Sequence, residues 1–356
     1  MMRTNRIEAL QAALTAQGLD ALLLLSPVNI RYAVRFFIMN GALVITPHRA
    51  ALVTDSRYIE AAQEEVTDAE VLLATSEHPL ASVVLELLTG CKTVGAEERS
   101  LPHADWTAWE GRLGQPLRPA ETLLLDARAV KDAEELENIT AAQRIAETAL
   151  DEVLGLLHPG MTEREVAAEL TYRMLRHGGE GNSFDPITVT GHKTSIPHAV
   201  PGDDVIERGD FVLMDFGCLR NGYCSDMTRT VAVGTPTDEM RRVYDIVFEA
   251  QAAGIAAARA GVTGAEIHNA AAKVIADAGY GHAFGHAFGH SLGLEIHETP
   301  GATPKNLEPM PVGAVISAEP GIYLPGKFGV RIEDMLCLTP DGNRNLTNAP
   351  KELIIL

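Results

Sequence analysis

The sequence predicts two domains of unequal size, an α/β domain followed by a larger α+β domain whose helices pack on one face of a sheet. Its 356 residues are too many for one typical core and too few for three. In the first third, apolar runs alternate with amphipathic stretches, which is typical of an α/β layer domain. From residue 182 onwards the chain is rich in Gly, Pro and β-forming residues. We therefore expect a first domain over 1–126 and a second over 127–356.

The elements of the first domain follow from the spacing of its apolar residues. A short amphipathic pattern predicts a helix over 6–17, which Gly18 ends. A further helix is expected over 58–65. Continuous apolar runs predict buried strands over 21–25, 42–45 and 50–54.

Four longer helices are predicted in the second domain. The first follows a polar-apolar pattern over 131–157 and ends at Pro159 and Gly160. Thr162, with Glu165 three residues later, forms a capping box that begins the second helix. Two more helices are expected over 239–260 and 265–278.

A Gly-His repeat follows the last of these helices, with histidines at 282, 286 and 290. Histidines four residues apart would share one face of a helix, which is a common arrangement for binding metals. However, a glycine precedes each histidine and disfavours the helix by about 1 kcal/mol per residue. We therefore expect a loop that leads into a strand.

Composition excludes several classes of function. Lys and Arg number 29 against 48 Asp and Glu, and the net charge of −19 opposes binding to a nucleic-acid backbone. No stretch approaches the roughly 20 apolar residues that a membrane span needs. Residues 1–6 and the polar positions that follow them do not resemble a secretory signal. Four widely spaced cysteines are typical of free thiols in a reducing compartment, so we expect a cytoplasmic protein.

A first hairpin is predicted around Asn221-Gly222, a strong signal for a two-residue turn. If these two residues form the turn, Asp226 lies opposite Gly217, and Asp215 is its diagonal neighbour on the same face. Diagonal positions lie about 7–8 Å apart, a gap that two carboxylates can span through a shared metal ion.

A second hairpin is predicted over 315–323 and 329–334, with a three-residue loop at 325–327. This loop sets Glu319 directly opposite Glu333, where two bare carboxylates would repel each other. Any one of these acidic residues alone could simply face solvent. Two hairpins that each present an acidic pair among apolar neighbours favour a binding site, because buried charges must be paired or bind metal.

Charge balance predicts the number of metal ions. The four carboxylates carry four negative charges, which two divalent cations would neutralise. Oxygen-rich ligation favours Mn²⁺ or a neighbouring divalent metal, and Co²⁺ and Zn²⁺ can share the same ligand set. One imidazole is expected as a fifth ligand, and His290 is the best candidate. For His282 and His286 a purely structural role is equally open.

With these residues in place, the chain resembles the pita-bread metallopeptidases, the family of methionine aminopeptidase, prolidase, aminopeptidase P and creatinase. The likeness covers about residues 130–356, and the first third resembles the smaller domain that prolidases and aminopeptidases P place before the catalytic one. It rests on the strings 214–217, 225–230, 289–298, 318–321 and 330–334. The resemblance implies a dinuclear site with five ligands: Asp215, Asp226, His290, Glu319 and Glu333.

The resemblance also implies hydrolysis of an Xaa-Pro bond, with Glu319 accepting a proton from the nucleophile. His198 and His297 match the family's two outer histidines, which would bind the scissile carbonyl and stabilise the tetrahedral intermediate. Positions in the substrate pocket are matched by His286, Arg331 and Tyr323. A homodimer is implied as well.

Our first interpretation is an Xaa-Pro aminopeptidase, which releases the N-terminal residue from peptides with proline second. The alternative is an Xaa-Pro dipeptidase, or prolidase, which must neutralise the carboxylate of proline and for which a fixed arginine is suited. Prolidases that this chain resembles often carry Arg directly after His-Glu-Xaa-Pro, whereas Gly301 follows Pro300 here. An alternative of another class is a catalytically inactive pita-bread module that binds peptides or proteins.

Overall fold

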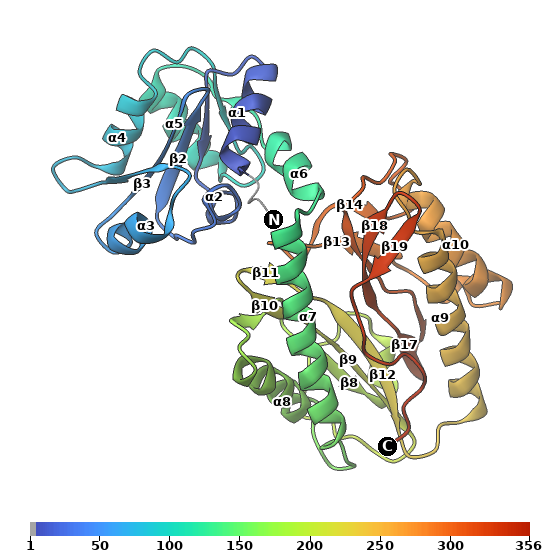
Figure 1. Cartoon of the computed structure of the whole chain (residues 1–356). Coiled ribbons are helices and arrows are strands. Elements are labelled where there is room, and N and C mark those ends of the chain that lie inside the picture. Colours follow the sequence, from blue (N-terminus) through green and yellow to red (C-terminus); the bar gives the residue numbers. More distant parts are fainter. Residues whose placement is uncertain (1–4) are drawn as a thin grey trace. The chain divides into compact units, whose positions relative to one another are not determined.

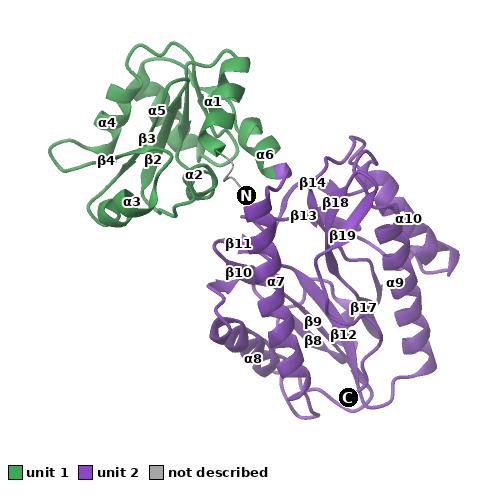
Figure 2. Ribbon diagram, viewed as in Figure 1, with its two compact units in different colours: residues 1–128 green, residues 129–356 purple. Residues whose placement is uncertain are grey.

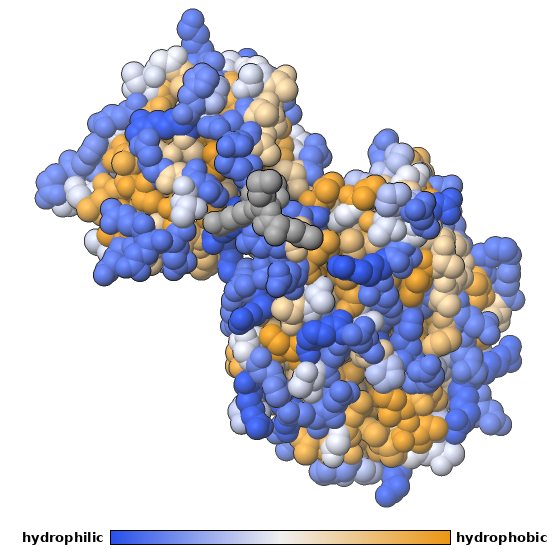
Figure 3. Space-filling view, in the orientation of Figure 1, coloured by the Kyte–Doolittle hydropathy of each residue, from blue (hydrophilic) through white to orange (hydrophobic). Residues whose placement is uncertain are grey.

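The computed structural model describes residues 5–356. The first four residues, which belong to the N-terminal segment compared with secretory signals, lie outside the described residues. The chain divides into two compact units, residues 1–128 and 129–356 (Figure 2). Each unit carries a mostly hydrophilic surface with interspersed apolar residues on the face shown in Figure 3.

The first unit is a six-stranded mixed sheet with helices around it, as predicted for an α/β domain (Figure 1). Its strand order is β4-β3-β2-β1-β5-β6. The pairs β1-β2 and β2-β3 are antiparallel, whereas β3-β4, β1-β5 and β5-β6 are parallel. The strands are β1 (Ala21–Leu24), β2 (Gly41–Thr46), β3 (Arg49–Thr54), β4 (Glu70–Leu73), β5 (Val94–Ala96) and β6 (Arg118–Pro119). The helices are α1 (Arg6–Ala16), α2 (Pro27–Val34), α3 (Ile59–Glu65), α4 (Leu80–Leu87), α5 (His103–Leu113) and α6 (Thr122–Ala129).

The second unit has long helices packed against short antiparallel sheets, which confirms the predicted α+β class (Figure 1). Its helices are α7 (Ala133–Leu154), α8 (Glu163–Arg176), α9 (Asp238–Ala257) and α10 (Gly264–Asp277), with 3₁₀ turns η1 (Gly191–Ser195) and η2 (Gly281–Ala283). The capping box of Thr162 and Glu165 begins α8, as expected. The Gly-His repeat is not helical beyond η2 and leads into strand β13, also as expected.

The strands of the second unit form four sheets. A three-stranded sheet has the order β12-β9-β8, a five-stranded sheet the order β14-β13-β15-β18-β19, and two small sheets are β11-β10-β7 and β16-β17. Their bounds are β7 (Gly181–Asn182), β8 (Ile187–Thr190), β9 (Asp210–Phe216), β10 (Cys218–Arg220), β11 (Tyr223–Cys224), β12 (Met227–Val233), β13 (Gly289–Ser291), β14 (Glu298–Ala302), β15 (Val315–Ala318), β16 (Gly321–Leu324), β17 (Phe328–Arg331), β18 (Asp334–Thr339) and β19 (Gly342–Asn345).

Each pair of helices covers its own set of strands. Apolar residues of α7 and α8, such as Leu150 and Leu170, share one core with Met214 of β9. Residues of α9 and α10 share a second core with β15 and β18, in which Ile267 and Ile316 are fully buried. A third cluster packs Val315 and Met335 of the five-stranded sheet against Ile139 of α7, so α7 contacts this sheet as well.

Both hairpins have the predicted register. Asn221 and Gly222 take positive φ angles of 47° and 73°, which a type I′ turn requires. Cys224 pairs with Leu219 and Met227 pairs with Phe216, so the same register places Asp226 level with Gly217.

In the second hairpin, Leu324 pairs with Phe328 across the three-residue loop. The register continues unchanged to the pairing of Ala318 with Asp334 on β15 and β18. Glu319 and Glu333 are therefore level with each other, in the gap between the two strand pairs.

Packing around Gly254 of α9 yields a first prediction. A Cβ at this position would lie 2.2 Å from the ring of Phe288, which is fully buried. We expect Gly254→Ala to lower the free energy of unfolding by about 1–3 kcal/mol, because overpacking outweighs the better helix propensity of alanine. Unfolding in urea, followed by circular dichroism, measures the change.

The matched control is Gly111→Ala in α5, where a Cβ would meet no atom within 4 Å. That change should raise stability by about 0.4–1 kcal/mol, as helix propensity and the entropy of the unfolded chain predict. Equal effects of the two substitutions would contradict the packing argument.

Candidate metal centre

Five residues predicted as metal ligands line one cavity of about 500 Å³ in the second unit. Asp215 and His290 lie on strands β9 and β13, whereas the other three lie where strands are interrupted. Asp226 falls between β11 and β12, Glu319 between β15 and β16, and Glu333 between β17 and β18. At these interruptions the side chains can turn toward a common point.

The distances between these ligand atoms bring them within reach of shared cations. One ligand atom from each of Asp226, His290 and Glu333 lies within 4.8 Å of the other two. The Nε2 atom of His290 is 3.4 Å from Oδ2 of Asp226 and 3.4 Å from Oε1 of Glu319. The fifth residue, Asp215, interacts electrostatically with Asp226, Glu319 and Glu333.

Asp226 and Glu333 resist ionisation because they are buried. Burial raises the pKa of Asp226 to about 7; the hydrogen bond with His290 opposes this shift and the charge of Asp215 adds to it. Burial also raises the pKa of Glu333 far above its ordinary value, and the charges of Asp226 and Glu319 act in the same direction. Such carboxylates need a positive partner.

Two side chains of the second unit supply positive charge here: Arg331 contacts Asp215, and His290 lies beside Asp226 and Glu319. Burial alone would lower the pKa of His290, but Asp226 and Glu319 outweigh burial and raise the pKa to about 9. One imidazolium and the guanidinium of Arg331 cannot neutralise four carboxylates. Bound divalent cations would supply the missing charge and would invert the local preference for protonation.

The remaining oxygen atoms fit divalent cations. Oδ1 of Asp215 and Oδ1 of Asp226 are buried without a hydrogen-bond partner. A buried carboxylate oxygen without a partner is costly unless it is a ligand. Carboxylates with one imidazole form an oxygen-rich donor set of the kind that Mn²⁺ and its neighbours accept. The residues present therefore fit a metal centre.

A chain of polar contacts extends from Asp215 through the cavity wall. Nη2 of Arg331 donates to Oδ2 of Asp215 at 2.5 Å, and Nη1 donates to the hydroxyl of Tyr323 at 2.8 Å. The same hydroxyl lies 2.9 Å from Nε2 of His286. The three residues predicted to line the substrate pocket thus form one connected group. Burial raises the pKa of Tyr323 to about 12, so its hydroxyl stays protonated as a donor.

The two outer histidines also line the cavity. The ring of His297 packs edge-on against His290, with 4.4 Å between ring centroids. Burial lowers the pKa of His297, and the neighbouring charge of His290 lowers it further. His198 is close enough to act electrostatically on both His297 and His286. At neutral pH, His297 is therefore an uncharged imidazole that can donate one hydrogen bond.

Sequence reasoning missed several residues that hold the predicted ligands. The hydroxyl of Thr228 donates to Oε2 of Glu333 at 2.6 Å and accepts from Nε of Arg331. The hydroxyl of Ser317 donates to Oε1 of Glu319 and accepts from the backbone N–H of His290. The available signal was their spacing: Thr228 lies two residues after Asp226, and Ser317 lies two residues before Glu319. Residues two apart in an extended chain point to the same side.

Another missed feature is a buried ion pair beside His297. Nζ of Lys131 lies 3.0 Å from Oε2 of Glu298, the next residue, and both side chains are almost fully buried. Apolar residues complete the cavity wall: Phe184, Pro186, Ile187, Pro197, Ala199, Val200, Pro201 and Ile296.

A cavity with clustered carboxylates, histidines and apolar walls defines a metal-dependent hydrolytic site. Comparison with known proteins gives the family. Residues 137–340 match the model of metallopeptidase family M24, and residues 6–130 match the creatinase/prolidase N-terminal domain. The chain belongs to metallopeptidase family M24, as the predicted resemblance to pita-bread metallopeptidases indicated.

Similar proteins cover almost the whole chain. The Xaa-Pro dipeptidase of Pyrococcus furiosus is 34% identical, over 98% of this chain and 99% of its own. The structure of an Xaa-Pro dipeptidase from Bacillus anthracis aligns with a TM-score of 0.95 at 37% identity, over 99% of both chains. The structure of an X-Pro aminopeptidase from Thermotoga maritima aligns with a TM-score of 0.91 at 36% identity, over 95% of this chain and 98% of the other.

Within residues 5–356, none of the helices combines the length and the apolar character that crossing a membrane would require.

Metal removal tests the charge argument. We expect chelation to lower the thermal unfolding midpoint and added Mn²⁺ to restore it, because the cation neutralises buried carboxylates. At a free concentration a hundred times its dissociation constant, the ion should stabilise the protein by about 2.7 kcal/mol. Asp226→Asn, which removes one ligand charge, should gain much less from Mn²⁺. Identical melting of the wild-type protein with and without Mn²⁺ would refute the metal centre.

A further prediction concerns the Tyr323 hydroxyl. Tyr323→Phe leaves Nη1 of Arg331 with the carbonyl of Pro197, 3.5 Å away, as its remaining partner. The substitution should lower the free energy of unfolding by about 1–3 kcal/mol, since a buried charged donor loses its partner. Tyr172→Phe, at an exposed position of α8, is the control and should change stability by less than about 0.5 kcal/mol. Chemical unfolding measures both, and equal effects would contradict this role of the hydroxyl.

Proposed function

We propose that this metallopeptidase hydrolyses the peptide bond before proline in Xaa-Pro dipeptides, with two divalent metal ions held by Asp215, Asp226, His290, Glu319 and Glu333. The observation that carries hydrolysis is the convergence of these five residues on one cavity beside His198 and His297. The choice of dipeptides is supported by relatives that cover nearly the whole chain and are named Xaa-Pro dipeptidase. This choice favours the alternative interpretation of the sequence, a prolidase, over the first one, an aminopeptidase.

Three residues of the chain take direct roles in the proposed reaction. Glu319 accepts a proton from the attacking water, for which a carboxylate within hydrogen-bond reach is suited. His198 and His297 donate hydrogen bonds to the scissile carbonyl oxygen as negative charge develops on it. The chemistry that bound divalent cations supply is Lewis-acid activation of the water and of the carbonyl.

The apolar wall suits proline as the leaving residue. An Xaa-Pro bond lacks an amide N–H, so its recognition must rely on the shape of the ring and on the carbonyl group. Phe184, Ile187 and Ile296 offer apolar surface next to the ligands. His286 and Arg331 form a polar part of the same pocket wall, and the hydroxyl of Tyr323 contacts both of them.

A second candidate function is Xaa-Pro aminopeptidase activity on longer peptides. Among the described residues that line the cavity, Arg331 is the only Arg or Lys, and Asp215 and Tyr323 already engage its guanidinium. A dipeptide brings a free carboxylate close to the scissile bond, and a free cation would normally meet it. The similar structure of a Thermotoga maritima X-Pro aminopeptidase supports this candidate too.

Three further expectations stay predictions. Mn²⁺ is the proposed metal, with Co²⁺ and Zn²⁺ as alternatives for the same donors. A homodimer is implied by the family resemblance, and light scattering measures it directly. The third is a cytoplasmic location, where a reducing environment would keep the four cysteines out of disulfides, as they are in this structure.

Substrate length separates the two activities. With Mn²⁺ added after chelation, we expect kcat/KM for Leu-Pro to exceed that for Leu-Pro-Gly by at least about tenfold, roughly 1.4 kcal/mol of transition-state binding. Mass spectrometry of the products measures both rates. Preference for the tripeptide would establish the aminopeptidase instead.

Two controls accompany the comparison of Leu-Pro with Leu-Pro-Gly. Leu-Ala tests whether proline is required, and Asp226→Asn tests whether the metal centre carries the activity. A wild-type protein that binds Mn²⁺ but cleaves none of these peptides would support the third interpretation, an inactive peptide-binding module.

A further inference from the structure

Arg229 of β12 lies three residues after Asp226 and is buried to 1% exposure, yet it does not face the cavity. Side chains alternate along a strand, and the neighbouring Thr228 is the one that contacts Glu333 on the cavity side. Arg229 therefore lies behind the metal centre. A buried arginine there requires partners for its whole guanidinium group.

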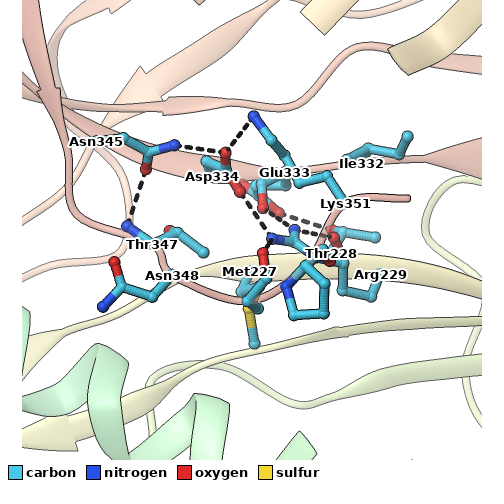
Figure 4. A network of polar contacts seen from close by, with 12 residues as sticks. Met227, Thr228, Arg229, Ile332, Glu333, Asp334, Asn345, Thr347, Asn348 and Lys351 are labelled. Atoms are coloured by element: carbon cyan, nitrogen blue, oxygen red, sulfur yellow. Dashed lines mark hydrogen bonds and ion pairs between the residues drawn. The ribbon is translucent and has the colours of Figure 1, made fainter. Parts of the chain in front are cut away.

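Every N–H of the Arg229 guanidinium has an acceptor (Figure 4). Nε donates to the carbonyl of Pro350, and Nη2 donates to the carbonyl of Ala349 at 2.8 Å and to Oδ1 of Asp334 at 2.9 Å. Nη1 donates to the carbonyls of Thr228 and Glu333, at 2.9 and 2.6 Å. Five donors and five acceptors fix the group in one orientation.

Asp334, the partner of Arg229, is held from its other oxygen. Oδ2 accepts from Nδ2 of Asn345 at 2.7 Å and lies 3.1 Å from Nζ of Lys351 (Figure 4). The carboxylate is as fully buried as the arginine. The pair thus joins β12, β18, β19 and the segment 349–351.

This network fixes the backbone of Glu333 on both sides. Its N–H donates to the carbonyl of Thr228 at 3.1 Å, and its carbonyl accepts from Nη1 of Arg229. The same Nη1 atom binds the carbonyl of Thr228, so one nitrogen sets the spacing of the two strands at this level. Asp226 precedes one of these strands and Glu333 precedes the other.

We propose that Arg229, together with Asp334 and the carbonyls of residues 349 and 350, is a positioning group that sets the distance between Glu333 and Asp226 and thereby the affinity for divalent metal. The proposal rests on the metal centre of the proposed function. A buried ion pair contributes little net stability compared with apolar residues of similar volume, so its more specific contribution is geometry. Partners behind metal ligands commonly change metal affinity 10- to 100-fold when they are removed.

The test measures Mn²⁺ binding to the full chain after chelation, by titration calorimetry and by the electron paramagnetic resonance signal of free Mn²⁺. Arg229→Met and Asp334→Asn should weaken binding by about 10- to 100-fold. Arg229→Lys keeps the charge but not the planar fork, so it should restore affinity only in part. The control is Arg173→Met, whose ion pairs with Glu152 and Glu169 contact no ligand.

The outcomes are distinct. Folded Arg229→Met and Asp334→Asn proteins with Mn²⁺ affinity within twofold of wild type would overturn the positioning role. If neither variant folds, the Mn²⁺ affinity of Lys351→Met tests the positioning role instead. This substitution removes only the partly exposed contact of Lys351 to Asp334. A threefold or greater loss of Mn²⁺ affinity supports the proposal, and a smaller change overturns it. A wild-type chain that binds no Mn²⁺ would instead refute the metal centre, and this role with it.

Discussion

Mutual repulsion among four clustered carboxylates, three of them buried, is the constraint on which the rest of the second unit depends. Burial raises the pKa of Asp215, Asp226 and Glu333, and the charges of His290 and Arg331 are too few to offset those of four carboxylates. Two features of the fold accommodate these carboxylates. It leaves Oδ1 of Asp215 and Oδ1 of Asp226 without a hydrogen-bond partner, as ligands for cations would be, and it holds the backbone of Glu333 through Thr228 and Arg229.

Two arginines contact Thr228 of β12 from different strands: Nε of Arg331 donates to its hydroxyl, and Nη1 of Arg229 donates to its carbonyl. Arg331 faces the cavity, where it binds Asp215 and the hydroxyl of Tyr323. Arg229 faces away and binds mostly carbonyl groups together with Asp334. Arg331 therefore brings a positive charge to the cavity wall, and Arg229 links the backbone of Thr228 to that of Glu333.

Local chemistry made much of this predictable from the sequence. The Asn221-Gly222 turn and the loop around Gly326 each set a register, and a strand register fixes which residues share a face. Turn chemistry alone therefore sufficed to place Asp215 beside Asp226, and Glu319 opposite Glu333. Capping boxes and the glycines of the Gly-His repeat predicted helix boundaries in the same way, because they act over a few residues.

Contacts between distant segments were beyond such reasoning. The turns determine each hairpin alone, but the meeting of Thr228 with Glu333, 105 residues apart, depends on packing of the two sheets. The hydrogen bonds from Arg229 to the carbonyls of residues 349 and 350 could not be predicted either, since every residue has a backbone carbonyl and the sequence does not mark which one accepts. The sequence by itself determined the two acidic pairs, through local turn geometry. Only the tertiary structure decided that the pairs line one cavity and which buried groups hold them there.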